Sequence, residues 1–186
     1  SAYTVADRTH GTAMASLIVR GDLSIEGPPI ARPVYVRPIM KPISWIESPR
    51  PEQIPNEVLV VDHIHRAVRR MFEGDGTAAA SAPTIRIINF SVGDPCRQFT
   101  QVLSPLARLL DWLSFKYRVV FVISAGNHAQ DIETGIAKTE YDALPDNEKE
   151  AAIIRALYGN ARHRRILSPG ESINGITVGA LHRDNA

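Results

Sequence analysis

The sequence predicts an α/β fold in which a mostly parallel β-sheet is flanked by helices on both faces. Short apolar, β-branched runs alternate along the chain with longer stretches whose apolar residues recur at helical spacing. Such alternation is typical of β-α-β crossovers, which build parallel sheets. The chain has 186 residues, of which 44% are hydrophobic and 22% charged. It is therefore long and apolar enough for one globular domain with a core.

The first half of the chain holds one predicted strand between two predicted helices. A helical stretch starts near His10, and residues 33–39 (PVYVRPI) are rich in β-branched and aromatic residues, as strands are. A second helix ends at Phe72 and takes Asn56 as its N-cap. The Pro-rich stretch 28–55 indicates a long loop rather than a linker between domains.

The second half repeats the pattern more clearly. Residues 84–90 (TIRIINF) predict a strand, and a helix opens at Ser104, which is followed by proline, and runs to about Lys116. Residues 118–124 (RVVFVIS) form an apolar run typical of a strand buried on both faces. Residues 176–181 (ITVGAL) resume the strand pattern.

Between the last two strands the pattern loosens. In residues 128–165 a helix capped by Asp146 can extend through Tyr158, but its polar and charged character suggests a surface excursion. We therefore expect a single domain over residues 1–186 with a surface insertion at 128–165.

Charge and composition exclude several classes of partner. The formal net charge is +1, which provides no electrostatic reason to expect nucleic acid or a membrane surface as partner. No stretch approaches the roughly 18 uninterrupted apolar residues of a membrane span. The cluster 162–165 (RHRR) is interpreted as a solvated loop face.

Nothing in the sequence favours a metal or a cofactor. Cys96 is the only cysteine, which excludes an internal disulfide and a multi-cysteine zinc site. His63 and His65 lie two residues apart in a predicted helix, so their side chains do not face the same way. The segment GDGTAAAS lacks the Lys-Ser/Thr ending of a phosphate-binding loop.

The candidate functional residues follow the predicted strands, because ligands of parallel sheets bind at the carboxyl ends of the strands. The loops after 84–90 and 118–124 should open on the same edge of the sheet. A third element, His10 within Thr-His-Gly-Thr, sits at a helix start, where its ring can face a cleft. The loop candidates are Ser91, Val92 and Gly93 after the first strand, and Ser124, Gly126 and Asn127 after the second.

The order of four motifs points to a known family. HGT is followed by IINFSVG, then by VISAGN and finally by GITVGA. This order resembles the subtilisin-like (subtilase, S8) serine proteases, whose histidine block is HGT, whose substrate-binding strand ends N-x-S-x-G and whose oxyanion asparagine closes an A-G-N turn. The resemblance covers nearly the whole chain, with gaps at 22–32, 40–55 and 128–165, and implies a subtilisin-like fold truncated at both ends.

The resemblance assigns roles to the candidates. His10 falls on the catalytic histidine, which takes the proton from the serine nucleophile and returns it to the leaving amine. Asn127 falls on the side-chain donor of the oxyanion hole, and 91–93 on the strand that pairs with an extended substrate. Ser124 and Gly126 would line the primary specificity pocket. If ITVGA is aligned with the family without gaps, Pro169 would lie near the floor of this pocket and the bulky Leu167 near its base, which implies a shallow pocket.

A rival placement reads GTAMAS as the family's serine block G-T-S-M-A, with Ala13 in place of the serine. That block lies after the A-G-N turn in the family, whereas GTAMAS precedes both SVG and SAGN and directly follows His10. The histidine-block interpretation is therefore preferred.

Two members of the triad are missing from the pattern. Only Asp7 precedes His10, too close for a separate strand to carry it, and no G-T-S-M-A block follows Ala180. We therefore expect a fragment of a serine endopeptidase that acts on peptide or protein substrates, with the aspartate and serine outside this chain. The alternative is a catalytically inactive subtilase-like module that binds peptides or proteins. Calcium, common in the family, has no supporting carboxylate cluster, and exposed core surface would favour self-association.

Overall fold

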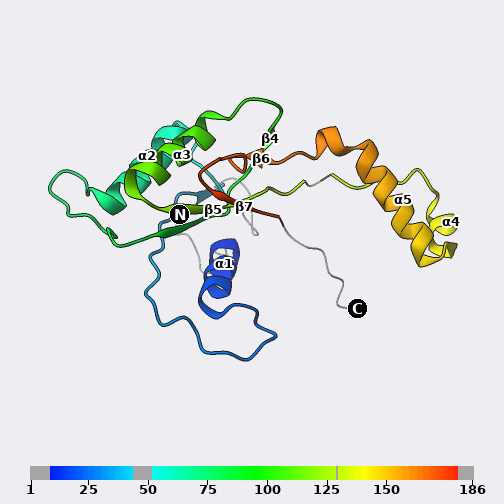
Figure 1. Ribbon diagram of the computed structural model, residues 1–186, viewed down its shortest axis with the longest axis horizontal. Helices are drawn as coiled ribbons and strands as arrows, with labels where there is room; N and C mark the ends of the chain where they lie inside the picture. The colour runs from blue at the N-terminus through cyan, green and yellow to red at the C-terminus, as the bar shows by residue number, and fades with distance from the viewer. Residues whose placement is uncertain (1–8, 44–51, 129, 180–186) are drawn as a thin grey trace. The chain divides into compact units, whose positions relative to one another are not determined.

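The structure is a computed structural model that describes residues 9–43, 52–128 and 130–179. The chain divides into two compact units, Ser1–Pro83 and Thr84–Ala186. Figure 1 shows the helices and strands with their labels. None of the helices within the described residues is long and apolar enough to cross a bilayer.

A parallel three-stranded sheet forms the centre of the second unit. Its strands are β3 (Ile87–Phe90), β5 (Val120–Ser124) and β7 (Ile176–Val178), hydrogen-bonded in the order β3-β5-β7. Phe90 pairs with Ile123, and Ser124 with Val178. With a helix packed against its central strand, the second unit has the predicted α/β architecture.

Helix α3 (Pro105–Tyr117) lies in the connection between β3 and β5 and packs against β5. Its N-cap is Ser104, whose Oγ accepts a hydrogen bond from the Ala107 N–H at 3.1 Å. Its C-cap is Arg118, in the left-handed conformation at φ 52°. The predicted helix is confirmed. The predicted strand 118–124 starts two residues later than expected, because Arg118 still belongs to the helix cap.

The two faces of the sheet differ in burial. Phe121 and Ile123 are fully buried, and Phe121 meets Phe90 edge to face with ring centroids 6.4 Å apart. On the opposite face Val120 is 39% exposed and Ile176 is 56% exposed. The prediction that 118–124 is buried on both faces is therefore wrong: the continuous apolar run conceals an alternation in which every second side chain reaches the core.

A second, antiparallel pair was not anticipated from the sequence. Strand β4 (Asp94–Gln98) pairs with β6 (Leu167–Ser168), and the register shifts between Asp94 and Gln98. The Phe99 N–H extends the pair by donating to the Ile166 carbonyl at 2.8 Å. This pair places β6 beside the segment that follows β3.

The segment between β5 and β6 holds α4 (Lys138–Ala143), α5 (Asp146–Gly159) and a short 3₁₀ turn, η2 (Ala161–His163). The N-cap of α5 is Pro145, so Asp146, predicted as the cap, is instead the first helical residue. Ala152 is the buried residue of α5, whereas Ile154 is 56% and Tyr158 85% exposed. Most side chains of α5 are thus exposed or half-buried, and the surface insertion expected at 128–165 stays a prediction.

The first unit contains α1 (Thr9–Arg20) and α2 (Val60–Phe72). The N-cap of α2 is Leu59, without a side-chain hydrogen bond, so the prediction of Asn56 as cap is wrong. The Val58 N–H bonds to the Pro55 carbonyl, and this turn holds Asn56 outside the helix. The buried face of α2 consists of Ile64, Ala67, Val68 and Met71.

The strand predicted at 33–39 does not form, and residues 33–40 have no regular structure. Pro33 and Pro38 lack the N–H that a strand ladder requires, and Val36 is 67% exposed, so burial does not support strand propensity here. The only strands in the described part of this unit are the two-residue β1 (Lys41–Pro42) and β2 (Glu52–Gln53), an antiparallel pair within the predicted long loop 28–55.

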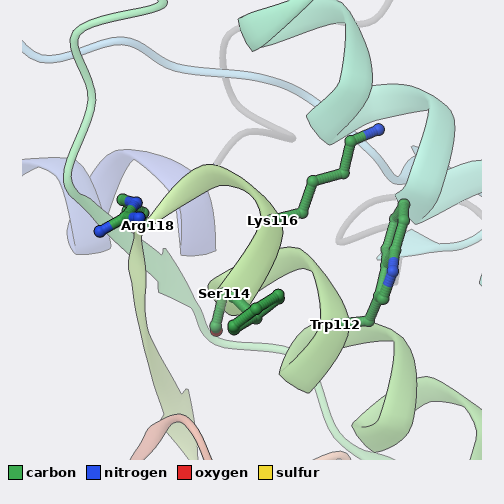
Figure 2. Close-up of a pocket in the computed structure, with 5 residues that line it drawn as sticks. Trp112, Ser114, Lys116 and Arg118 are labelled. Carbon is green, nitrogen blue, oxygen red and sulfur yellow. The ribbon is translucent and has the colours of Figure 1, made fainter.

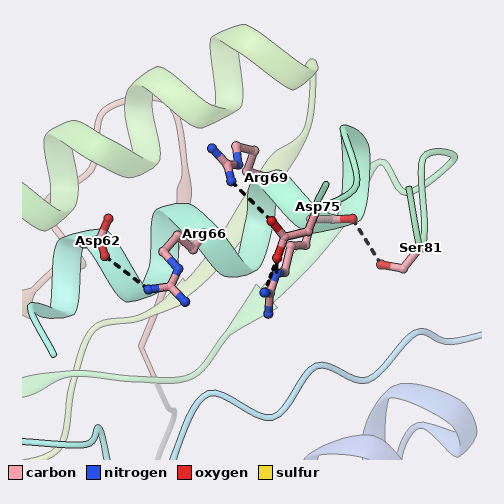
Figure 3. Close-up of polar contacts among 6 residues, drawn as sticks. Asp62, Arg66, Arg69, Asp75 and Ser81 are labelled. Carbon is pink, nitrogen blue, oxygen red and sulfur yellow. Dashed lines mark hydrogen bonds and ion pairs between the residues drawn. The ribbon is translucent and has the colours of Figure 1, made fainter. Parts of the chain in front are cut away.

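The end of α2 is fastened to the turn that follows it (Figure 3). Arg70 Nε donates to Asp75 Oδ2 at 2.6 Å, and Arg69 lies 3.7 Å from the other carboxylate oxygen. The hydrogen bond from Arg70 holds the pKa of the Asp75 carboxyl below its ordinary value. At Gly74, with φ 80°, an added methyl group would lie 2.2 Å from the Ala78 carbonyl oxygen, so this turn requires glycine.

Candidate active site

The loops that follow β3 and β5 meet at one edge of the sheet. Because β3 and β5 are parallel and in register, their carboxyl ends lie side by side. A methyl group placed on Gly93, in the first loop, would lie 3.5 Å from the α-carbon of Gly126 in the second. The structure therefore brings together the two loops that the sequence analysis selected.

The first loop, residues 91–93, joins β3 to β4. Asn89 Nδ2 donates to Ser91 Oγ at 3.0 Å, which links the loop to the end of β3. Ser91 and Val92 are half-buried, and Gly93 is exposed. An exposed main chain at a sheet edge offers N–H and C=O groups to an extended peptide.

The second loop is held by three hydrogen bonds. Ser124 Oγ accepts from the Gly126 N–H at 3.1 Å, and the Ala125 N–H donates to the Val178 carbonyl at 2.9 Å. The Ala125 carbonyl accepts from the Leu167 N–H at 2.9 Å. Gly126 has φ 98°, a conformation that favours glycine. Asn127 follows directly and is exposed, so a fixed turn presents its side chain.

Leu167 fills the space that the two glycines face. A methyl group on Gly126 would lie 2.5 Å from Leu167 Cγ and 2.6 Å from its Cβ and Cδ1. A methyl group on Gly93 would lie 3.7 Å from Leu167 Cβ. Leu167 is only 2% exposed. The bulky residue that the resemblance put near the pocket base therefore packs directly on both loops.

Behind Leu167, a buried polar cluster ties β6 to the start of α3. Ser168 Oγ donates to Ser104 Oγ at 2.6 Å, and the Ser104 N–H donates to Glu171 Oε1 at 3.0 Å. Sequence reasoning identified Ser104 as a helix cap and missed its second role. A buried serine pair separated by 64 positions has no local motif that could have revealed it.

His10 is the second residue of α1 and is exposed. Its helical position agrees with the expected helix start. It belongs to the first unit, whereas the six loop candidates belong to the second. The catalytic role that the resemblance gives His10 stays a prediction.

A separate pocket lies at the other end of β5 (Figure 2). It is lined by α3 and its cap, and Lys116 Nζ lies 4.9 Å from the ring centroid of Trp112 within it. Arg118, which precedes the amino end of β5, also lines it. The pocket contains none of the candidate residues and lies away from the carboxyl edge where Asn127 is found.

Outside the loops, His63 and Cys96 have side chains of a metal-binding type and were not assigned to a site from the sequence. His63 Nε2 lies 2.9 Å from the Ile39 carbonyl oxygen, within hydrogen-bond distance. Cys96 is a free, exposed thiol, and its N–H donates to Asp94 Oδ1 at 2.9 Å. Within residues 9–43, 52–128 and 130–179, no group of three or more His, Cys, Asp or Glu side chains could hold a metal ion.

Comparison with known proteins agrees with this arrangement. The subtilase family model matches residues 2–186. No curated protein and no solved structure matches the chain significantly. The family match spans both compact units, and with it the His10 block, the 91–93 loop and the Asn127 turn. The chain therefore belongs to the subtilase family of serine proteases.

Proposed function

We propose that the chain is part of a serine endopeptidase that cleaves peptide bonds by a Ser-His-Asp mechanism. Asn127 donates to the oxyanion, 91–93 pairs with the substrate backbone, and His10 transfers the proton. The aspartate and the serine come from residues outside these 186. The observation that supports the proposal is the close approach of the Gly93 loop to Gly126, the residue that immediately precedes Asn127.

Asn127 suits an oxyanion donor for a physical reason. Hydrogen bonds from Gly126 and to Ala125 hold its turn, so the donor needs little reorganisation when negative charge develops on the carbonyl oxygen. One such hydrogen bond lowers the barrier by about 2.7–4 kcal/mol, a magnitude known from a subtilisin itself. The adjacent 91–93 loop would position the scissile carbonyl by pairing with the peptide backbone.

His10 supplies the acid–base chemistry in this proposal. Its imidazole takes the serine proton during attack and returns it to the departing amine. An aspartate is needed to hold the ring in the correct tautomer, and the 186 residues contain no D-[ST]-G turn ahead of His10. The proposal therefore expects the chain to be inactive by itself.

The first prediction concerns a fluorophosphonate probe, which labels activated serines. The 186-residue chain should show no activity-dependent labelling, because no G-T-S-M-A block follows Ala180. The longer parent protein should be labelled at one serine outside this chain, and H10A should remove that labelling. His163, an exposed histidine of η2, provides the matched control H163A, which should leave labelling intact. Robust single-site labelling of the isolated chain would overturn the proposal.

The second prediction concerns the oxyanion donor. In the parent protein, N127A should lower kcat about 100- to 1,000-fold with little change in KM, because the hydrogen bond strengthens only in the transition state. Asn160 bonds to the Ala156 carbonyl in α5, so N160A removes a similar amide away from the loops and should leave kcat unchanged. Steady-state kinetics on a peptide substrate measures both, and an N127A enzyme with full kcat would contradict the assigned role.

A second function is favoured by the missing serine block. A chain without a nucleophile forms no acyl-enzyme, yet the 91–93 loop could still bind extended peptides or partner proteins. The parent sequence separates the two functions. A D-[ST]-G turn ahead of His10 together with a G-T-S-M-A block after Ala180 supports the peptidase, and the lack of either supports the binding module.

A further inference from the structure

The geometry points to Leu167 as the residue that closes the specificity pocket, so that the substrate residue before the scissile bond must be glycine or alanine. This inference rests on the proposed function, because it takes Asn127 as the donor to the reacting carbonyl and 91–93 as the substrate-pairing loop. It goes beyond that function by naming the class of substrate and the side chain that selects it.

The position of the pocket follows from these two assignments. A peptide paired with 91–93 whose reacting carbonyl lies at Asn127 places one residue against the Gly93 and Gly126 loops, which lie close together. The side chain of that residue enters the space that both glycines face. Gly93 and Gly126 have no side chains of their own, so the adjacent loops leave this space open to a third group.

In this chain the third group is Leu167. Three of its carbon atoms, Cβ, Cγ and Cδ1, lie within 2.6 Å of the point that a methyl group on Gly126 would occupy. Its Cβ and Cδ1 lie 3.7 and 3.9 Å from the corresponding point on Gly93. A deep open pocket beside Leu167 would expose its side chain to solvent, but Leu167 is only 2% exposed. There is therefore no room beside it for a long substrate side chain.

Leu167 is also held in place. Its N–H donates to the Ala125 carbonyl at 2.9 Å, and its carbonyl accepts from the Gly170 N–H at 2.8 Å. Gly170 is fixed in turn by a hydrogen bond from the Thr177 hydroxyl to its carbonyl. Admitting a phenylalanine or leucine would require this anchored segment to shift, and close-packed interiors resist such shifts.

The test measures binding rather than catalysis, so it does not need the serine or the aspartate. Two acyl-tripeptides that differ only in the last residue, alanine or phenylalanine, are titrated into the 186-residue chain. Kd is followed from the NMR signals of Gly126 and Asn127. The alanine peptide should bind at least about tenfold more tightly, because a single methylene in an apolar pocket already discriminates about 10- to 200-fold.

Variants locate the effect at Leu167. L167A should reverse the preference, because the shorter side chain makes room for phenylalanine and lowers the Kd of the phenylalanine peptide. Circular dichroism checks that the variant is folded. I173A removes a side chain that is 74% exposed and should leave the preference unchanged. G93A adds a methyl group at ordinary contact distances of 3.5–3.9 Å, so the variant should fold normally. The added methyl group should raise the Kd of the alanine peptide.

Each outcome bears on the inference separately from the peptidase. Equal binding of both peptides by the unmodified chain overturns the inference, as does a chain that binds neither. Fluorophosphonate labelling of the parent decides the peptidase without reference to side-chain preference. A labelled parent whose 186-residue portion prefers phenylalanine would leave the proposed function intact and reject the role of Leu167.

Discussion

Helices α3 and α5 are nearly equal in length, 13 and 14 residues, but the fold uses them very differently. Helix α3 buries Leu106, Leu110 and Leu113 and has a serine N-cap that accepts a hydrogen bond. Helix α5 buries Ala152 and has Pro145 as its N-cap, without a side-chain hydrogen bond. One helix contributes to the core, and the other is largely exposed.

The difference shows that packing, more than helix propensity, determines what a helix contributes. An isolated helix of this length is marginal in water, so its stability comes mainly from the face it buries. For α3 that face contacts β5, and its cap Ser104 also holds Ser168 beside Leu167. Helix α3 therefore links stability to the shape of the candidate pocket.

The largest expected effect comes from truncating the buried face of α3. L110A should lower the free energy of unfolding by about 2–5 kcal/mol, because Leu110 is fully buried and its removal leaves a cavity. Urea denaturation of the two proteins measures the difference.

A matched control comes from the other helix. I154A removes a side chain of the same class from α5, where it is 56% exposed, and should change stability by no more than about 0.5 kcal/mol. If I154A destabilised the chain as much as L110A, then α5 would be packed like α3 and the comparison would fail.

A smaller effect should follow from the cap of α3. S104A removes the acceptor for the Ala107 N–H and for the buried Ser168 hydroxyl, so it should lower the free energy of unfolding by about 1–3 kcal/mol. T100A, which removes an exposed hydroxyl in the same unit, is the control and should be nearly neutral. An unchanged urea midpoint for S104A would mean that the cap and its buried partner contribute nothing to the stability of α3.

Local signals were the part of the fold that the sequence predicted well. The Ser-Pro opening and the apolar spacing of 104–116 are contained in the helix itself, and the helix is confirmed. Residues 33–39 have strand propensity but no partner strand, and the strand does not form. The prediction that 118–124 is buried on both faces is wrong, because an apolar composition does not show that only every second side chain along the strand is buried.

For the candidate site, the sequence predicted the two loops but not the contacts that hold them in place. The positions after two parallel strands follow from chain order, so 91–93 and Asn127 were found together on one sheet edge. The pairing of β4 with β6 and the contact of Ser104 with Ser168 join residues far apart in sequence. Such contacts depend on the folded backbone, which no short pattern in one sequence encodes.

The hydrogen bond between Ala125 and Leu167 has a consequence for how the chain can vary. It joins the two ends of the segment that holds α4 and α5, so that segment is a loop closed at its base. The entropy of closing a flexible loop grows only with the logarithm of its length, and a twofold change in length alters the free energy by about 0.6 kcal/mol. The closure entropy therefore places little limit on how many helices this segment holds.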